Sequence, residues 1–344
     1  MSVEAGAVTQ NRQWLLASRP ETAISEANFV QATAELAEPK HGQVAVRVTH
    51  IAYEPAMRGW VREVPGQGSN VKLNGVMRSQ GAGEVIASRH PDFQPGDRVT
   101  GFFGWQQYAV VDVAGELLPV KKLPTGVTEE MALSVLGITG LTAYFGMLDV
   151  GRPRAGDTVV VSGAAGATGS IAGQIARISG CRVIGIAGGA DKCRWLTGDA
   201  GFDAAVDYKT DDVSAQLKRL CPTGINVFYD NVGGAILEAA LDNIALGSRI
   251  VICGGISGYN VADGEWPGPR NYMRIVNNPS TMSGFLLGQF SARFGEAWTR
   301  LADWTRDGRI RFAADVQEGF DNVPATLMRL FNGQNLGKQL CRIG

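Results

Sequence analysis

The chain has 344 residues, with 32 basic and 33 acidic side chains and a formal net charge of −1 at pH 7. This length is sufficient for two domains of ordinary size. A near-neutral charge balance creates no field that would attract nucleic acid or a membrane surface, so we expect a small-molecule partner. The sequence shows neither an apolar run long enough to span a membrane nor an export signal, and we expect a cytoplasmic protein.

The cysteine and histidine residues give no sign of a metal site. Five cysteines stand singly, and three histidines lie apart, with no C-x-x-C or H-x-x-x-H spacing. We therefore expect neither a disulfide framework nor a bound metal. The cysteines are expected to be small buried apolar side chains.

The first 125 or so residues contain short strand-like runs separated by glycine and proline. The clearest runs are QVAVRVTHIAY (43–53), GEVIASR (83–89), DRVTGFF (97–103) and QQYAVVD (106–112). Runs of this kind, bounded by turn residues, predict an antiparallel, barrel-like domain.

From about residue 126, strand-like runs alternate with amphipathic segments of helix length. The strand-like runs cover residues 158–163, 181–188, 204–208, 225–230 and 248–255. This rhythm predicts a doubly wound parallel sheet with helices on both faces. Residues 291–310 predict one amphipathic helix with Phe294, Trp298 and Leu301 on its packed face, and the tail predicts a short helix followed by a strand.

A glycine-rich turn follows the first of these strands. Residues 164–169 read A-A-G-A-T-G, which is the pattern G-x-G-x-x-G with alanine in its first position. Gly166 would let a pyrophosphate approach the backbone, and Gly169 would let the next helix pack closely on the sheet. Because the turn joins a strand to an amphipathic helix, it predicts dinucleotide binding.

The next strand ends without the acidic residue that an NAD site places there. Its end is Ala187 or Gly188, and Lys192 follows in the next segment. An acid at this position binds the ribose hydroxyls and repels a 2′-phosphate, whereas a lysine attracts one. The sequence therefore predicts NADPH over NADH, although Lys192 alone is also compatible with a solvated surface lysine and Asp191 beside it is a weak contrary signal.

Longer motifs carry a family resemblance over nearly the whole chain. GAGEVI, QPGDRV and LGITGLTAYFGML, with the glycine turn, resemble the medium-chain dehydrogenase/reductase superfamily. GCRVIGIAGGADKCRWL, GFDAAVDYKT, YDNVGG, RIVICGGISGYN and NLGK are similar to its zinc-independent branch, which contains prostaglandin reductase (leukotriene B4 dehydrogenase) and the alkenal and enone double-bond reductases.

The resemblance implies a fold, an assembly and a cofactor site. It implies a GroES-like β-barrel catalytic domain over residues 1–130, to which 310–344 return, a Rossmann domain over 131–309 that binds NADPH, and a homodimer. The pyrophosphate residues would be Gly166, Ala167, Thr168 and Gly169, the 2′-phosphate residues Lys192 and Tyr208, and Asn231 would lie along the cofactor. The nicotinamide end would be surrounded by Cys253, Gly255, Ile256, Ser257, Tyr259, Phe285, Leu286, Leu287 and Asn335.

The chain departs from the family pattern at two positions, one in the glycine turn and one in the pocket. Thr168 replaces an apolar residue of the turn, and Ala56 stands where relatives have a pocket tyrosine. The loop over residues 61–74 is also unusual, and we expect substrate choice to depend on it.

The implied reaction is reduction of a C=C bond conjugated to a carbonyl group. The cofactor supplies the hydride, and the protein supplies placement and a hydrogen-bond donor for the developing enolate oxygen. Tyr259 is our candidate donor, with packing under the cofactor as its alternative. Tyr53 is a second candidate for catalysis and for the pocket, with a half-buried tyrosine of the barrel as its alternative. Trp60, Trp105 and Phe285 would form an apolar substrate wall, or else belong to the core.

Other functions stay open from the sequence. A quinone reductase of the same superfamily and a non-catalytic NADPH-binding redox sensor are both compatible with these motifs. The missing ligands argue against a zinc alcohol dehydrogenase. Ser162 lacks the G-x-S-x-G context of a hydrolase nucleophile.

Overall fold

The computed structural model describes residues 9–63, 71–115, 118–261 and 268–344. The chain divides into two compact units. The barrel unit comprises residues 1–133, 316–334 and 339–344, and the sheet unit comprises 134–315 and 335–338. The expected divisions at 130 and 310 therefore lie close to those of the structure, but the four residues 335–338 belong to the sheet unit.

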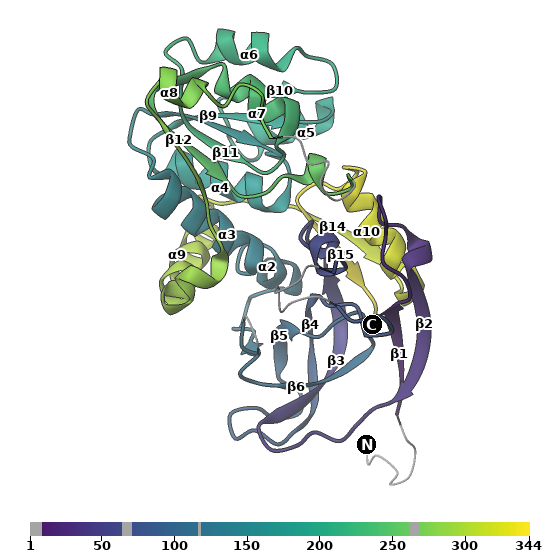
Figure 1. Cartoon of the computed structure of the whole chain (residues 1–344). Coiled ribbons are helices and arrows are strands. Elements are labelled where there is room, and N and C mark those ends of the chain that lie inside the picture. The colour runs from purple at the N-terminus through teal and green to yellow at the C-terminus, as the bar shows by residue number, and fades with distance from the viewer. Residues whose placement is uncertain (1–8, 64–70, 116–117, 262–267) are drawn as a thin grey trace. The chain divides into compact units, whose positions relative to one another are not determined.

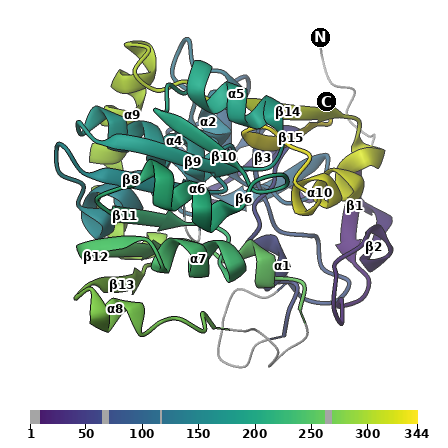
Figure 2. The same ribbon diagram turned by 90° about the horizontal axis from the view of Figure 1, so that it is seen from above.

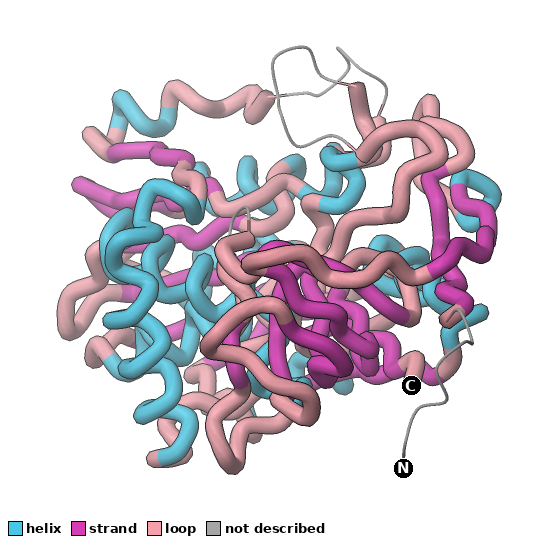
Figure 3. The backbone as a smooth tube through the Cα atoms, turned by 90° about the horizontal axis from the view of Figure 1, so that it is seen from below, coloured by secondary structure: helices cyan, strands magenta, loops and turns pink. Residues whose placement is uncertain are grey.

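The predicted strands of the barrel unit are present and antiparallel. They are β3 (Gln43–Ala52), β4 (Gln80–Ser88), β5 (Arg98–Phe102) and β6 (Tyr108–Asp112), with β3 pairing both β4 and β6. The tail returns to this sheet, because β15 (Lys338–Arg342) pairs β3 and β14 (Ala314–Glu318) lies beside β15. Short β7 (Lys121–Lys122) pairs β5. Figure 3 shows these strands in magenta, joined by long loops.

Several elements of this unit are not foreseen from the sequence. Strands β1 (Gln10–Leu16) and β2 (Phe29–Glu35) form a separate antiparallel pair. The helices are short: η1 (Glu26–Asn28), α1 (Met57–Trp60), α2 (Glu129–Leu133), η5 (Phe320–Asn322) and α10 (Val323–Phe331), of which only α10 is predicted. Side chains from β1, β3, β4, β5 and α10 share one apolar core.

The sheet unit has the predicted doubly wound parallel architecture (Figure 1). Its strand order is β10-β9-β8-β11-β12-β13, which places the reversal of strand order between β8 and β11. The strands are β8 (Thr158–Ser162), β9 (Arg182–Ala187), β10 (Ala204–Asp207), β11 (Ile225–Asp230), β12 (Ile244–Ile252) and the unpredicted β13 (Thr281–Gly284). The predicted crossover helices are α4 (Ala167–Ile178), α5 (Ala190–Gly198), α6 (Val213–Leu220) and α7 (Gly234–Leu241).

The remaining helices of this unit correct one prediction. The helix expected over 291–310 begins as the 3-10 turn η4 (Leu287–Arg293) and becomes α-helical only in α9 (Phe294–Arg306). Phe294 and Leu301 are buried as expected, Trp304 is also buried, and Trp298 is only partly buried. The other elements are α3 (Ile138–Phe145), the π-helical turn η2 (Gly146–Gly151), η3 (Ile256–Gly258) and α8 (Arg274–Asn277). Throughout the described ranges, the helices are too short or too polar to cross a membrane.

Candidate cofactor and active site

The glycine turn after β8 has the close approach that its pattern predicts. Gly163 has a φ of 56°, and Gly166 is the N-cap of α4 with no side chain to cover the helix N-terminus. A Cβ at Gly169 would lie 2.4 Å from the Gly163 carbonyl oxygen, so only glycine fits there. The first turn of α4, with Ala167 and Thr168, therefore presents N–H groups beyond the end of β8, where an anionic group is favoured.

A segment from the far end of the sequence holds this turn. The Gly337 N–H donates to the Ala165 carbonyl at 2.8 Å, and the Asn335 side chain donates to the Gly337 carbonyl at 2.8 Å. Gln174 of α4 binds both the N–H and the carbonyl of Arg311. Asn335, which the resemblance assigns to the nicotinamide end, thus lies in a loop that contacts the glycine turn.

A network of buried polar side chains joins β8 and β11 at the reversal of strand order. The Ser162 hydroxyl donates to Asp230 Oδ1 at 2.6 Å and accepts from the Asn231 N–H at 2.8 Å. The Asn231 side chain donates to the Ser162 carbonyl at 2.7 Å. Burial raises the pKa of Asp230, while hydrogen bonds from Ser162 and the Gly233 N–H oppose that shift. Ser162 is therefore a structural hydroxyl that holds Asn231, and Asp230 is a site residue that the sequence did not reveal.

The loop after β12 is fixed to the loop after β11. The N–H groups of Cys253 and Gly254 donate to the Asp230 carbonyl, and the Ser257 hydroxyl donates to the Val232 carbonyl at 2.6 Å. This attachment brings Cys253, Gly255, Ile256 and Ser257 beside Asn231. Burial raises the pKa of the Cys253 thiol to about 12, so it is a protonated thiol at neutral pH and not a nucleophile.

Tyr259 ends this loop with its hydroxyl turned back to the strand end. The Gly255 N–H donates to the Tyr259 hydroxyl oxygen at 3.3 Å. Burial raises the pKa of the phenol, so Tyr259 carries its proton at neutral pH. The arrangement fixes the position of a proton donor at the carboxyl edge of the sheet.

The three predicted residues 285–287 have different environments. The Phe285 ring lies against Gly146, where a Cβ would be 2.6 Å from the ring, and its centroid is 6.3 Å from that of Phe290. Leu286 is 74% exposed, and Leu287 begins η4. Phe285 therefore has a fixed position, whereas Leu286 extends into solvent.

The ends of β9 and β10 form a second part of the site. The Tyr208 ring covers Gly188, where a Cβ would meet the ring at 2.7 Å. Lys192 is half-buried on α5, and its pKa is lowered by burial and then by the charge of Lys209, with Asp315 opposing. The negative charge of Asp191 is paired with Arg194, so it repels an anion at Lys192 less strongly. The structure thus brings Gly188, Lys192 and Tyr208 together.

The candidate residues of the barrel unit lie mainly in its core. Tyr53 is 2% exposed, and its hydroxyl donates to the Val323 carbonyl at 2.9 Å. Trp105 is fully buried, with its ring 5.7 Å from Tyr53 and 4.8 Å from Phe29. These contacts favour the core alternative for both residues.

Trp60 and the residues around it are less enclosed. The Trp60 ring is partly buried, with the Arg78 guanidinium 5.3 Å from its centroid. Ala56 is exposed at the N-cap of α1. Residues 64–70 of the loop expected to govern substrate choice lie outside the described residues.

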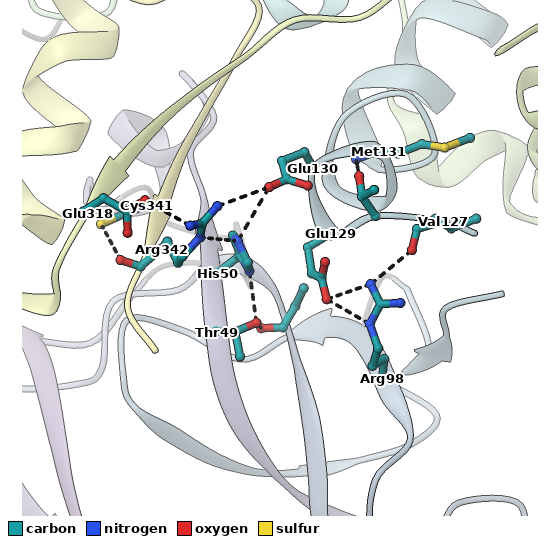
Figure 4. Close-up of polar contacts among 12 residues, drawn as sticks. Thr49, His50, Arg98, Val127, Glu129, Glu130, Met131, Glu318, Cys341 and Arg342 are labelled. Atoms are coloured by element: carbon teal, nitrogen blue, oxygen red, sulfur yellow. Dashed lines mark hydrogen bonds and ion pairs between the residues drawn. The ribbon is translucent and has the colours of Figure 1, made fainter. Parts of the chain in front are cut away.

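A polar cluster of titratable side chains lies in the barrel unit, outside these sites (Figure 4). Arg342 Nε lies 3.3 Å from His50 Nε2, and Glu130 Oε1 lies 3.9 Å from the same nitrogen. Glu318 lies 3.3 Å from the other side of the Arg342 guanidinium. Within the described residues, no group of three or more His, Cys, Asp or Glu side chains is arranged to hold a metal ion. All five cysteines are free; Cys181, Cys221 and Cys341 are buried as expected, whereas Cys193 and Cys253 are only partly buried.

Comparison with known proteins agrees with both units. Residues 12–119 match the family described as "N-terminal domain of oxidoreductase", and residues 167–303 match "Zinc-binding dehydrogenase". The NADPH-dependent curcumin reductase of Escherichia coli (strain K12) is 37% identical, over 97% of each chain. The 2-alkenal reductase (NADP(+)-dependent) of Nicotiana tabacum is 34% identical, over 93% of each chain.

A solved structure is similar over the same extent. CurA from Vibrio vulnificus in complex with NADPH has a TM-score of 0.89 and 35% identity, over 97% of this chain and 99% of that one. Identities above 30% over nearly the full length of both chains establish family membership. The chain therefore belongs to the zinc-independent branch of the medium-chain dehydrogenase/reductase family, as its motifs predict.

Proposed function

We propose that this chain is an NADPH-dependent reductase of the C=C bond of α,β-unsaturated ketones and aldehydes. The names of two relatives, a curcumin reductase and a 2-alkenal reductase, support this substrate class. The cofactor proposal is supported by those names and by the NADPH complex of CurA. The observation that carries it in this chain is the group of Gly188, Lys192 and Tyr208 at the end of β9.

The end of β9 fits a phosphorylated ribose better than an unphosphorylated one. No carboxylate follows β9 at the position that would accept hydrogen bonds from both ribose hydroxyls. The acid at the end of β10, Asp207, accepts from the Gly189 and Lys209 N–H groups at 2.8 and 3.0 Å, so its Oδ1 serves the backbone. Lys192 is then the cation that meets the 2′-phosphate, and Tyr208 covers the neighbouring backbone.

The glycine turn fits the pyrophosphate. At Gly169 the helix packs so closely on the turn that a Cβ would not fit. The N–H groups of Ala167 and Thr168 belong to a helix N-terminus that no side chain caps. These are the features by which a βα turn binds a pyrophosphate. Asn231, held by Ser162, would lie along the cofactor, and Cys253, Gly255, Ile256 and Ser257 would border its nicotinamide end.

The chemical step needs one hydride and one proton. NADPH, when bound, would supply the hydride for the β-carbon of the substrate. Tyr259 donates a hydrogen bond to the carbonyl oxygen and stabilises the enolate, which then takes a proton at its α-carbon from solvent. Phe285 is the proposed apolar contact for the substrate in the sheet unit, and Trp60 stays the candidate of the barrel unit. Tyr53 and Trp105 are left out because their side chains are packed in the core.

Turnover with a panel of acceptors tests the reaction class. The NADPH absorbance is followed with aliphatic alkenals, aryl enones and phenylpropenones, and separately with benzoquinones, and the products are identified. We expect saturated carbonyl products from the enones. Turnover of quinones alone would identify a quinone reductase, and no turnover with any acceptor would favour a non-catalytic NADPH-binding protein.

Substitution of Lys192 tests the cofactor assignment. Lys192→Ala removes a charged hydrogen bond to the 2′-phosphate, so NADPH affinity should fall about 10- to 100-fold while NADH affinity stays unchanged. Lys218→Ala is the matched control, because Lys218 is exposed in the last turn of α6, at the opposite end of the parallel strands. Equal losses for both cofactors would contradict the assignment.

The proposed homodimer has a candidate surface in the sheet unit. Strand β13 is the edge of its sheet, and Figure 2 shows β13 and α8 together at that edge. Tyr272, Met273 and Val276 near or on α8 are 51 to 63% exposed. An open strand edge beside exposed apolar side chains is a surface that a second copy would cover. Light scattering of the purified chain tests this, and a monomer at all concentrations would contradict it.

A further inference from the structure

The turns that follow β9 and β10 are joined by one carboxylate. Asp207 Oδ1 accepts from the Gly189 N–H at 2.8 Å and from the Lys209 N–H at 3.0 Å. The Tyr208 N–H also donates to the Ala187 carbonyl at 3.1 Å. These bonds hold the backbone of Lys209 beside the end of β9, where Gly188 lies under the Tyr208 ring.

Lys209 thereby places a second cation near Lys192. Lys209 is exposed, and after burial its charge is the main cause that lowers the pKa of Lys192. Two like charges held near each other repel, and an anion bound near both removes this repulsion. Lys192 and Lys209 together therefore form a site that favours a doubly charged anion.

The carboxylates near this pair have other contacts. Asp191 pairs with Arg194, and Asp207 serves the two turns. Asp211 accepts from the Asp207 N–H at 3.0 Å, and Asp212 caps α6 by accepting from the Ala215 N–H at 3.1 Å. Asp315 is the acid whose charge opposes the lowered pKa of Lys192. The contacts of Asp191, Asp207, Asp211 and Asp212 thus fix the local backbone or neutralise Arg194.

We propose that Lys209 is a second cation for the 2′-phosphate of NADPH and that Asp207 positions it by joining the turns after β9 and β10. This inference rests on the proposed cofactor. It extends the specificity site from one lysine to two, and it gives Asp207 a role opposite to that of the acid in an NAD site. Asp207 favours the phosphorylated ribose because it organises the backbone and does not bind the ribose.

Binding of 2′,5′-ADP and 5′-AMP by calorimetry isolates the 2′-phosphate. For Lys209→Ala in the full chain, we expect the affinity for 2′,5′-ADP to fall about 2- to 5-fold, as for an exposed charge pair, with 5′-AMP binding unchanged. The dependence of 2′,5′-ADP binding on salt concentration should also become shallower. Lys218→Ala should change neither quantity. An unchanged affinity for 2′,5′-ADP, or an equal loss for 5′-AMP, would overturn the role of Lys209.

A pair of variants tests Asp207 as a positioning residue. Asp207→Ala removes the acceptor for both N–H groups, so 2′,5′-ADP affinity should fall about as far as in Lys209→Ala. Asp207→Asn keeps an acceptor oxygen and should restore most of that affinity. If Asp207→Asn weakened binding as much as Asp207→Ala, the carboxylate charge and not the geometry would matter, and the positioning role would be wrong.

Lys192→Ala distinguishes failure of this inference from failure of the proposed cofactor site. If Lys192→Ala weakens 2′,5′-ADP binding while Lys209→Ala does not, only the second lysine is wrong. If neither variant weakens it, the 2′-phosphate lies elsewhere and the proposed cofactor site is wrong as well.

Discussion

Tyr53 in the barrel unit is buried and Tyr259 in the sheet unit is partly buried, and their hydroxyl groups have different hydrogen-bond partners. In the barrel unit, Tyr53 follows β3 and donates to the Val323 carbonyl at 2.9 Å. In the sheet unit, Tyr259 follows η3 and accepts from the Gly255 N–H at 3.3 Å. Burial raises the pKa of both phenols. Burial and pKa therefore do not separate Tyr53 from Tyr259, the proposed catalytic residue, whereas the hydrogen-bond partner of the hydroxyl group differs between them.

The same contrast extends to the surroundings of the two residues. Around Tyr53, apolar and aromatic side chains pack together, and the core would be altered by changing any of them. Around Tyr259, the loops are fixed by main-chain bonds between residues 230–232 and 253–257. A site built from backbone groups depends on glycines, whereas a packed core depends on side-chain volume.

Among the substitutions considered, replacing Gly337 should lower stability most, because Gly337 binds the glycine turn through main-chain groups. Gly337 has a φ of 68°, and an added Cβ would lie 2.0 Å from the Ala313 carbonyl oxygen. Gly337→Ala should therefore lower the free energy of unfolding by about 2–4 kcal/mol and weaken NADPH binding through the bond to Ala165. Chemical denaturation and cofactor titration measure the two effects.

Gly333 provides the control for Gly337. Its φ of 62° is similar, but no atom lies within 4 Å of an added Cβ. Gly333→Ala should cost only about 1 kcal/mol, from the left-handed backbone conformation alone. Equal losses in the two variants would show that the contact with Ala313 contributes nothing.

The two tyrosines themselves offer the next test. Tyr259→Phe removes the proposed donor to the enolate, so kcat for an enone should fall about 10- to 100-fold. Loss of the 3.3 Å contact with the Gly255 N–H should lower the free energy of unfolding by about 1 kcal/mol. Steady-state kinetics and thermal unfolding of the same preparations measure this. An unchanged kcat would assign Tyr259 to packing on the cofactor.

Tyr53→Phe should have the converse effect. The substitution leaves the Val323 carbonyl, which is in a fully buried residue, without its phenolic donor. We expect a loss of about 1–2 kcal/mol in the free energy of unfolding and no change in kcat. A variant of normal stability with reduced kcat would instead restore Tyr53 to the catalytic site.

The features that could be predicted from the sequence are those set by residues close together along the chain. The glycine turn, the βαβ rhythm and Lys192 after a neutral strand end are all local patterns, and the structure has each of them. The Ser162–Asp230 hydrogen bond joins side chains 68 residues apart in the sequence, and the Gly337–Ala165 hydrogen bond joins the C-terminal segment to the glycine turn after β8. Only the folded sheet brings such partners together.

Two further features could not be decided from the sequence, for different physical reasons. Tyr53 and Trp105 fit both a pocket wall and a core, because an apolar side chain is equally suited to either. Strand β13 reads TMSG, which is too short and too polar to show a strand pattern, yet it pairs β12 in register. Its strand character comes from backbone pairing and not from its side chains.

The smallest expected effect concerns the polar cluster of the barrel unit. His50 Nε2 accepts from Arg342 Nε, and Nδ1 lies 3.0 Å from a Thr49 hydroxyl that itself donates to the Ala82 carbonyl (Figure 4). The neutral imidazole with its proton on Nδ1 satisfies these contacts. Burial lowers the pKa of His50 below 6.5; the charge of Arg342 adds to this shift, and those of Glu130, Glu129 and Glu318 oppose it.

This lowered pKa gives stability a defined pH dependence. Because the unfolded chain binds the proton more readily, the stabilisation is complete above the unfolded pKa of about 6.5 and is lost as the pH falls toward the folded pKa. One such group changes the free energy of unfolding by less than about 1.4 kcal/mol per pH unit. His50→Asn keeps a donor in the place of Nδ1 but cannot titrate, so its unfolding free energy should fall less than that of the unsubstituted chain between about pH 7 and pH 5. Parallel curves for the two proteins would show that His50 does not titrate on unfolding in this range.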